Sequence, residues 1–518
     1  MRRLLKNTVM ISFLTLGSRI LGVIRDALIA MVFGTSFQSD AFFIAFRPFD
    51  LVRKLFSEGI LSISFVPVFS RTLEKEGKSK TIAMVFSFLC FLSVIGTTIV
   101  LAGFVFAPFM IKIIAPGFVE NPVASGLTIY LFKIMLPYLW CIFIIALCMG
   151  VLNTLGNFGT PAVAPVLFNI VVIIFTLFSY NLFDIPVAGL ALGVTIGGIV
   201  QLLIQIPFMI RLGMFNPQFF KVFHPDVLAV FKIMLPCMIG AASYQINIMV
   251  ASFFASKLDE GSVSYMYYAD RLVQFPLALF AVSVATVFLP ELSRRASLGN
   301  LDTIAPLFSK GVKLVFFITI PAMAGLMVLN EQIVAFLFGH GKFDVLAVKQ
   351  TSDCLFFLVT GLWAFTGVRI FVTLYYALSS IKVPFYCGLV SMALNLFFCY
   401  FSSGYFGLKG LVLSVSLSSI VGFVLLFINI PGKVNIDRFS ILVSACRSLF
   451  LSVIMFFIIK LAMPFLFNLS NDKLSLGAGL ATAVSLGVVV YLGLNLFIST
   501  PEFKLLKQGI IEKINDKT

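Results

Sequence analysis

The segment from Ser18 to Gly59 reads SRILGVIRDALIAMVFGTSFQSDAFFIAFRPFDLVRKLFSEG. It combines apolar runs long enough to enter a membrane with charged side chains that hydrocarbon disfavours. These charged residues are Arg19, Arg25, Asp26, Asp40, Arg47, Asp50, Arg53, Lys54 and Glu58. The apolar runs predict membrane helices, and the charges predict that these helices line something other than lipid.

The same apolar character extends over all 518 residues, of which 60% are hydrophobic and 11% charged. Soluble domains are closer to half apolar and a quarter charged. Apolar runs of about 20 residues recur along the chain, and each is long enough to cross the bilayer as a helix. These runs lack the alternation of barrel strands. The sequence therefore predicts an all-α polytopic membrane protein.

Hydrophobic runs and loop breakers predict about fourteen transmembrane helices. The first run is not a cleavable signal peptide, because it is longer than about 25 residues and contains Arg19 and Arg25. Lys and Arg gather in alternate loops, which places both termini in the cytoplasm. The expected spans are 8–34, 40–70, 82–115, 124–152, 161–182, 186–211, 226–256, 263–290, 308–329, 347–378, 384–402, 407–430, 439–466 and 474–499.

A short motif repeats six spans apart. FVPVFSR (65–71) ends the second expected span, and FLPELSR (288–294) ends the eighth. A parallel duplication would explain this spacing, and a chance match in so biased a composition is the alternative. With duplication, we expect an N-terminal six-helix lobe over 1–220 and a C-terminal six-helix lobe over 221–432. Two extra helices and a cytoplasmic tail would occupy 433–518.

Charges within the expected spans predict a hydrophilic cavity. A charge at the bilayer centre costs about 2.5–3.5 kcal/mol on insertion scales, so such residues face water or pair with one another. Guanidinium groups fork onto phosphate or carboxylate oxygens, which suits a dianionic headgroup such as a pyrophosphate. Arg25, Arg53 and Arg271 are expected to converge on a central cavity between the lobes.

The neighbouring carboxylates allow two interpretations. They can pair with the arginines and lock helices together, or form gates whose ion pairs separate in a second state. Arginines outnumber the carboxylates near them, which favours a ligand. For Asp40, a solvated helix end is an equally good interpretation. The residues expected in ion pairs or gates are Asp26, Asp40, Asp50, Glu58 and Asp270.

The sequence favours a transporter without nucleotide hydrolysis over an enzyme. It contains no H-E-x-x-H, G-x-S-x-G or G-x-x-x-x-G-K-[ST] segment. The histidines are His224 and His340, and the eight cysteines form no C-x-x-C pair, so we expect no metal and no cofactor. The net charge of +15 is spread over short loops, so we expect no nucleic-acid partner.

Several separated motifs resemble the MurJ (MviN) family, whose members are lipid II flippases of the MOP exporter superfamily. These motifs are SRILGVIRD, SDAFFIAFR, RKLFSEG, FVPVFS, APGF (115–118), YYADRLVQFP and GKF (341–343). The resemblance implies two six-helix lobes around a cationic central cavity, with a C-terminal helix pair forming a groove for the polyprenyl tail. It also implies alternating access that moves lipid II to the outer leaflet of a bacterial cytoplasmic membrane.

The resemblance further implies roles for individual residues. The substrate-binding arginines would hold the pyrophosphate, and the carboxylates would pair with them when the cavity is empty. Implied partners are lipid II and membrane lipids, and cell-wall synthases are a candidate partner. The arginines are Arg19, Arg25, Arg53 and Arg271, and the carboxylates carried over by motif are Asp26, Asp40 and Glu58.

Two departures from the family pattern bear on function. RPFDLVRK stands where the family reads close to LPNLLRR, so Asp50 replaces an Asn and Lys54 an Arg. Because Asp50 neutralises part of the cavity, we expect headgroup affinity or release to differ. The acidic residues of a cation site proposed for some relatives are also replaced, so we do not expect ion coupling there. The seventh and eleventh spans carry Ser243, Gln245, Asn247 and Asn395 instead.

Three alternatives stay open. A MOP-type exporter could carry another polyprenyl-linked oligosaccharide or small drugs, although cationic drugs call for carboxylates in the cavity. A membrane enzyme acting on a polyprenyl pyrophosphate would need a metal-binding carboxylate cluster or a catalytic base. A scaffold in a cell-wall complex would leave the buried arginines without a purpose.

Overall fold

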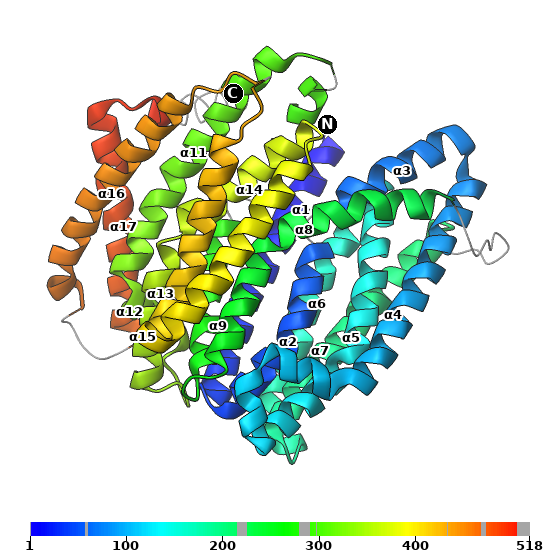
Figure 1. Cartoon of the computed structure of the whole chain (residues 1–518), viewed down its shortest axis with the longest axis horizontal. Coiled ribbons are helices and arrows are strands. Elements are labelled where there is room, and N and C mark those ends of the chain that lie inside the picture. Colours follow the sequence, from blue (N-terminus) through cyan, green and yellow to red (C-terminus); the bar gives the residue numbers. More distant parts are fainter. Residues whose placement is uncertain are drawn as a thin grey trace. The chain divides into compact units, whose positions relative to one another are not determined.

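The computed structural model describes residues 2–56, 61–214, 225–278, 288, 291–296, 298–432, 434–467 and 473–504. Nearly all of these residues are helical, and none of them forms a strand. Figure 1 shows long helices connected by short loops. The predicted all-α class is confirmed.

The chain forms two compact units, the first made of Met1–Ser264 with His340–Asp344, the second of Tyr265–Gly339 with Val345–Thr518. The helices of the first unit are α1 (Arg2–Phe33), α2 (Phe37–Leu55), α3 (Leu61–Glu76), α4 (Lys78–Ile114), the 3-10 helix η2 (Pro116–Glu120), α5 (Pro122–Thr154), α6 (Gly159–Leu182), α7 (Pro186–Arg211) and α8 (Pro225–Ala255). Helix α9 (Ser262–Pro276) begins in this unit and continues into the second.

The second unit contains the remaining helices. These are α11 (Leu301–Val328), α12 (Asn330–Phe338), α13 (Val345–Val359), α14 (Leu362–Ala377), α15 (Lys382–Ile428), α16 (Arg438–Phe467) and α17 (Lys473–Ile498). Helix α15 includes two expected spans, 384–402 and 407–430, which are separated by a kink at Gly407.

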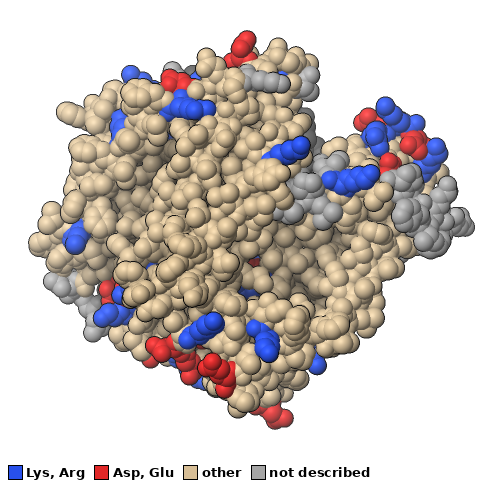
Figure 2. Space-filling view, in the orientation of Figure 1, with Lys and Arg blue, Asp and Glu red and all other residues tan. Residues whose placement is uncertain are grey.

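Membrane-spanning character is strong in the described chain. Eight of its helices are long and apolar enough to cross a bilayer, namely α4, α5, α6, α7, α11, α15, α16 and α17. The bent pair α13 and α14, with an angle of 46°, could form one more span. Figure 2 shows that charged side chains on the visible face lie mainly near helix ends. The count of fourteen spans stays a prediction.

Helix α8 packs on α2, α3 and α4 within the first unit. At its amino end, the Asp226 carboxylate accepts hydrogen bonds from Arg71 and Thr72 of α3, both at 3.0 Å. The sequence predicts that α8 begins the second lobe. The described contacts join it to the first unit, and the division at 220 and 432 stays a prediction.

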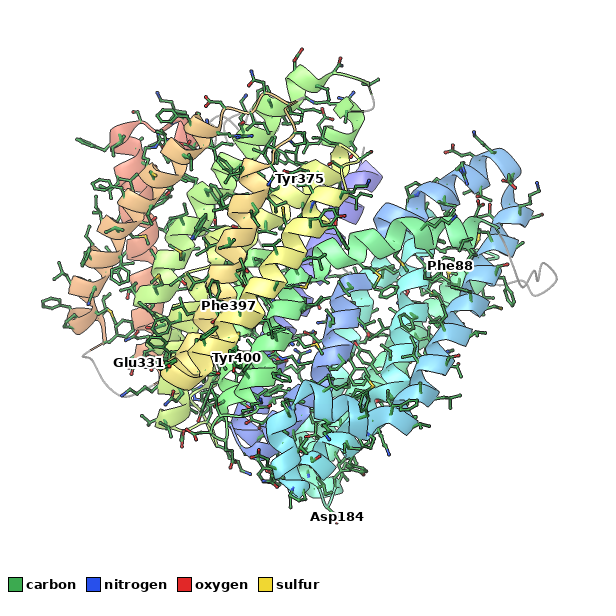
Figure 3. All side chains as sticks on the ribbon, in the orientation of Figure 1. Phe88, Asp184, Glu331, Tyr375, Phe397 and Tyr400 are labelled. Atoms are coloured by element: carbon green, nitrogen blue, oxygen red, sulfur yellow. The ribbon has the colours of Figure 1, made fainter. Side chains whose placement is uncertain are left out.

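The core of the second unit is aromatic. Phe423 of α15 packs against Trp363 and Phe371 of α14, with ring centroids 5.3 and 5.4 Å apart. The Tyr375 hydroxyl donates to the Leu426 carbonyl at 2.9 Å, which fixes α14 to α15. Tyr375 is labelled in Figure 3. These contacts make α14 and α15 one packed layer.

The last two helices attach to this core through α11. Tyr491 of α17 donates to the carbonyl of Phe317 at 2.9 Å, and the two rings lie 5.2 Å apart. Glu502, which follows α17, is buried and accepts hydrogen bonds from Ser444 and Arg447 of α16. The helix pair is therefore part of the second unit.

Helices α6 and α7 approach closely along a row of glycines. A Cβ added at Gly193 would lie 2.7 Å from the Phe175 Cβ atom, and additions at Gly189 and Gly197 would meet Phe183 and Phe168. Small residues let helices in lipid approach closely enough for extensive van der Waals contact. This contact holds α6 in place.

We predict that Gly193→Ala lowers the free energy of unfolding by about 1–3 kcal/mol, because the added methyl group forces α6 and α7 apart. Gly126→Ala is the matched control, since Gly126 lies exposed on α5 with no atom within 4 Å of the added methyl. Thermal unfolding in detergent measures both. Equal melting temperatures for the two variants would contradict the packing argument.

Candidate substrate site

The first charge cluster joins α1 to α6. Arg25 donates to Asp26 from Nε at 2.9 Å and from Nη2 at 2.7 Å, and to the Asn169 amide oxygen from Nη1 at 3.0 Å. The Asn169 amide nitrogen donates to the Ser18 carbonyl at 3.0 Å. The Arg25 side chain is 11% exposed. This guanidinium group is therefore held in a fixed orientation by two helices.

The second cluster joins α2 to α8. Asp50 accepts from Arg53 at 2.5 Å through one carboxylate oxygen and pairs with Lys54 at 3.0 Å through the other. Lys54 also donates to the Gln245 amide oxygen on α8 at 3.1 Å. One carboxylate thus bonds two cations.

The members of the second cluster differ in exposure. The Arg53 side chain is 36% exposed, whereas those of Asp50 and Lys54 are 12% and 10% exposed. Because Arg53 is accessible and its carboxylate partner is shared, it is the cation of this cluster best placed to change partners. An anion that reached Arg53 would compete with Asp50.

Asp40 ties α2 to the start of α9. Its carboxylate, 3% exposed, accepts from the backbone N–H of Gly261 at 2.7 Å and of Ser264 at 2.8 Å. The Ser264 hydroxyl donates to it at 2.5 Å. Glu260 in turn accepts from the N–H of Phe37, the first residue of α2, at 2.7 Å. The alternative that Asp40 is a solvated charge at a helix end is wrong. Its carboxylate is buried, and its oxygens accept hydrogen bonds from the backbone at the start of α9.

The GKF segment packs on the first unit, although its chain neighbours belong to the second. Lys342 donates from its backbone N–H to Met31 at 2.9 Å, and its ammonium group contacts the Tyr180 hydroxyl at 2.5 Å. Gly341 has a φ of +59°, and a Cβ there would lie 2.4 Å from the Met31 carbonyl oxygen. The glycine lets this loop lie against the end of α1.

The other candidate residues lie in separate places. Arg19 is half-buried on α1. Arg271, in the second unit, donates to the Tyr267 hydroxyl at 2.5 Å and lies 4.7 Å from the centre of its ring. Asp270 is buried and accepts from Gln274 at 3.4 Å. Glu58 lies outside the described residues. The convergence of Arg271 with Arg25 and Arg53 stays a prediction.

Sequence reasoning missed Asn169 and the pairing of Lys54 with Gln245. Asn169 is the polar residue in the apolar run PVLFNIVVIIF of α6. An amide in a membrane span needs a hydrogen-bond partner, so its position was a usable signal. Its partner, 144 residues away on α1, had no local signature.

Comparison with known proteins settles the family. A family model described as lipid II flippase MurJ matches residues 29–485. The chain belongs to the MurJ family. A probable lipid II flippase MurJ from Vibrio cholerae serotype O1 is 34% identical over 446 residues, which cover 84% of this chain and 85% of that protein. A lipid II flippase MurJ from Burkholderia cenocepacia is 31% identical over 428 residues, with 82% and 83% covered.

Solved structures agree with this assignment. A lipid II flippase MurJ in an inward closed conformation superposes with a TM-score of 0.78 at 27% identity, covering 94% of this chain and 98% of that one. An inward-facing MATE family transporter of the MOP superfamily has a TM-score of 0.65 at 14% identity, with 83% and 94% covered. The second similarity concerns the fold alone. MurJ proteins and MATE transporters thus share this helical architecture.

We predict that Asp40→Ala lowers the free energy of unfolding by about 1–3 kcal/mol, because it leaves the buried N–H groups of Gly261 and Ser264 without an acceptor. Glu260→Ala is the control, since the N–H that Glu260 bonds is exposed and water can replace the carboxylate. Thermal unfolding in detergent compares them. A larger loss of stability in Glu260→Ala than in Asp40→Ala would contradict the prediction that Asp40 is the more stabilising carboxylate.

Proposed function

We propose that this protein flips lipid II from the cytoplasmic to the outer leaflet of the bacterial cytoplasmic membrane by alternating access. Membership of the MurJ family supports this, as do the relatives named lipid II flippases, which this chain covers over most of their length. The observation that carries the proposal is the pair of charged clusters on α1 and α2, with Arg53 accessible. A pyrophosphate supplies the oxygens that guanidinium groups bind.

In this proposal the four arginines have different roles. Arg25 is a fixed donor, because Asp26 and Asn169 hold it. Arg53 is the donor that turns to the pyrophosphate, and Asp50 is the partner that it leaves. Arg19 and Arg271 would complete the headgroup contacts from α1 and from the second unit.

In the empty protein, the carboxylates reduce the repulsion between the arginines of the site, which allows the site to close. In this proposal Asp26 and Asp50 balance the arginines, and Asp40 holds α2 to the start of α9 as a latch. Opening the latch costs three hydrogen bonds to a buried carboxylate, so it would open only when another contact offsets them. Glu58 and Asp270 are the remaining proposed gate residues.

The proposal also concerns topology and partners. Both termini would lie in the cytoplasm, with two six-helix lobes around a central cavity. Helices α16 and α17 would form the groove for the polyprenyl tail. We propose no nucleotide hydrolysis by this chain and no cofactor, so the membrane potential is one energy source that fits a charged site, at about 2.3 kcal/mol per charge per 100 mV. Cell-wall synthases are proposed partners.

We predict that the wild-type chain restores outward lipid II in cells depleted of their own flippase, and that Arg53→Ala and Arg271→Ala reduce this by tenfold or more. Losing a charge-assisted hydrogen bond to the headgroup, worth about 1.5–3 kcal/mol, accounts for that magnitude. Leaflet-resolved accessibility of lipid II is the measurement, at matched membrane levels of each variant.

Arg294→Ala is the matched control, because the Arg294 side chain is 63% exposed and pairs with Glu291 three residues earlier. It should flip lipid II like the wild type. If Arg53→Ala and Arg271→Ala also match the wild type, the arginines are structural. If the wild type leaves lipid II inside, the substrate is another polyprenyl-linked oligosaccharide.

A further inference from the structure

Tyr138 of α5 is a fully buried tyrosine whose hydroxyl has no hydrogen-bond partner among the described residues. Its ring stacks on Phe168 of α6, with centroids 5.5 Å apart and planes inclined by 23°. Gly198 of α7 makes room for the ring, since a Cβ there would lie 2.3 Å from it. Packing therefore fixes the ring, while the hydroxyl contributes nothing to that packing.

Charged groups act on this buried hydroxyl. The charges of Arg53, Asp50 and Arg25 all act on it. Phe168, on which the ring stacks, is next in sequence to Asn169, the residue that holds Arg25. The hydroxyl thus lies close enough to both clusters of the candidate substrate site for their charges to act on it. A buried hydroxyl without a hydrogen-bond partner among the described residues needs an explanation, because buried polar groups are nearly always hydrogen-bonded.

The packing of α2 on α5 keeps these groups near one another. Phe49 contacts Phe132, and Phe56 contacts Phe143, each pair with centroids 5.2 Å apart. Arg53 lies between Phe49 and Phe56 on the same face of α2, at i+4 from the first. The two aromatic contacts therefore hold this turn of α2 against α5, whatever partner Arg53 takes.

Full burial argues against a direct contact between Tyr138 and a ligand. The Arg25 side chain already donates to Asp26 and Asn169, and Arg53 is the accessible cation that a phosphate would attract. Asp50 then loses its bond to Arg53 and keeps the one to Lys54. A carboxylate that loses a partner in a low-dielectric site needs another donor.

We infer that Tyr138 is a positioning residue whose hydroxyl donates a hydrogen bond to Asp50 when Arg53 turns to the phosphates of the headgroup. This inference rests on the proposed function. In the empty protein the hydroxyl is idle, and in the loaded protein it replaces Arg53 on the carboxylate. Tyr138 thereby lowers the cost of releasing Arg53.

The first test compares Tyr138→Phe with Tyr375→Phe. Both tyrosines are fully buried, but the Tyr375 hydroxyl already donates to the Leu426 carbonyl. In the empty protein, Tyr375→Phe should lower the melting temperature, and Tyr138→Phe should leave it unchanged or raise it. Equal losses of melting temperature would overturn the inference, because the Tyr138 hydroxyl would then be in use before any ligand arrives.

The second test measures lipid II flipping at matched membrane levels. Tyr138→Phe should flip about tenfold more slowly than the wild type, as expected for loss of a hydrogen bond to a charged group. Tyr375→Phe should stay within twofold of the wild type. A wild-type rate in Tyr138→Phe would overturn the inference while leaving the proposed function intact.

A double-mutant cycle with Asp50→Asn isolates the partner. If Tyr138 acts through the Asp50 charge, adding Tyr138→Phe to Asp50→Asn should change the flipping rate by less than twofold. A tenfold loss in both backgrounds would overturn the inference in favour of a structural role. Failure of the wild type to flip lipid II would instead refute the proposed function, a result that the melting temperatures do not depend on.

Discussion

The cost of placing a charge in hydrocarbon is the constraint on which the rest of this structure depends. A basic side chain that lies in hydrocarbon must be solvated, paired or held by neighbouring helices, because lipid offers no compensation. Asn169 from α6 and Gln245 from α8 meet this need for Arg25 and Lys54. The charges therefore organise the helices around them, and the first unit is built around groups that a lipid-facing bundle would exclude.

A shared carboxylate gives this arrangement its functional character. Asp50 bonds both Arg53 and Lys54, so the two cations share one carboxylate. The similarity to MATE transporters, at 14% identity, shows that the helical architecture alone does not determine the substrate. In the proposed function, the charged side chains of α1 and α2 contribute to that choice.

The sequence predicted the class of fold and the family, because apolar runs and motifs are local features. The sequence did not predict the contacts between segments that are distant in the chain. The partners of Asp40 lie 221 and 224 residues away, so its burial at a helix start could not be told from a solvated charge. Helix α8 packs within the first unit, and Lys342 packs against Met31 and Tyr180. Both contacts join segments that are distant in the sequence, so neither had a local signal. The idle hydroxyl of Tyr138 had no signature in a run as apolar as α5.

In the proposed function, Asp50 competes with an anionic headgroup for Arg53. Binding of lipid II to the purified protein in nanodiscs tests this most directly, with Asp50→Asn compared against the wild type. Removing the competing charge should tighten binding severalfold, since Arg53 no longer has to leave an internal ion pair. Weaker or unchanged binding in Asp50→Asn would contradict the account, because Asp50 would then support the headgroup site or stand apart from it.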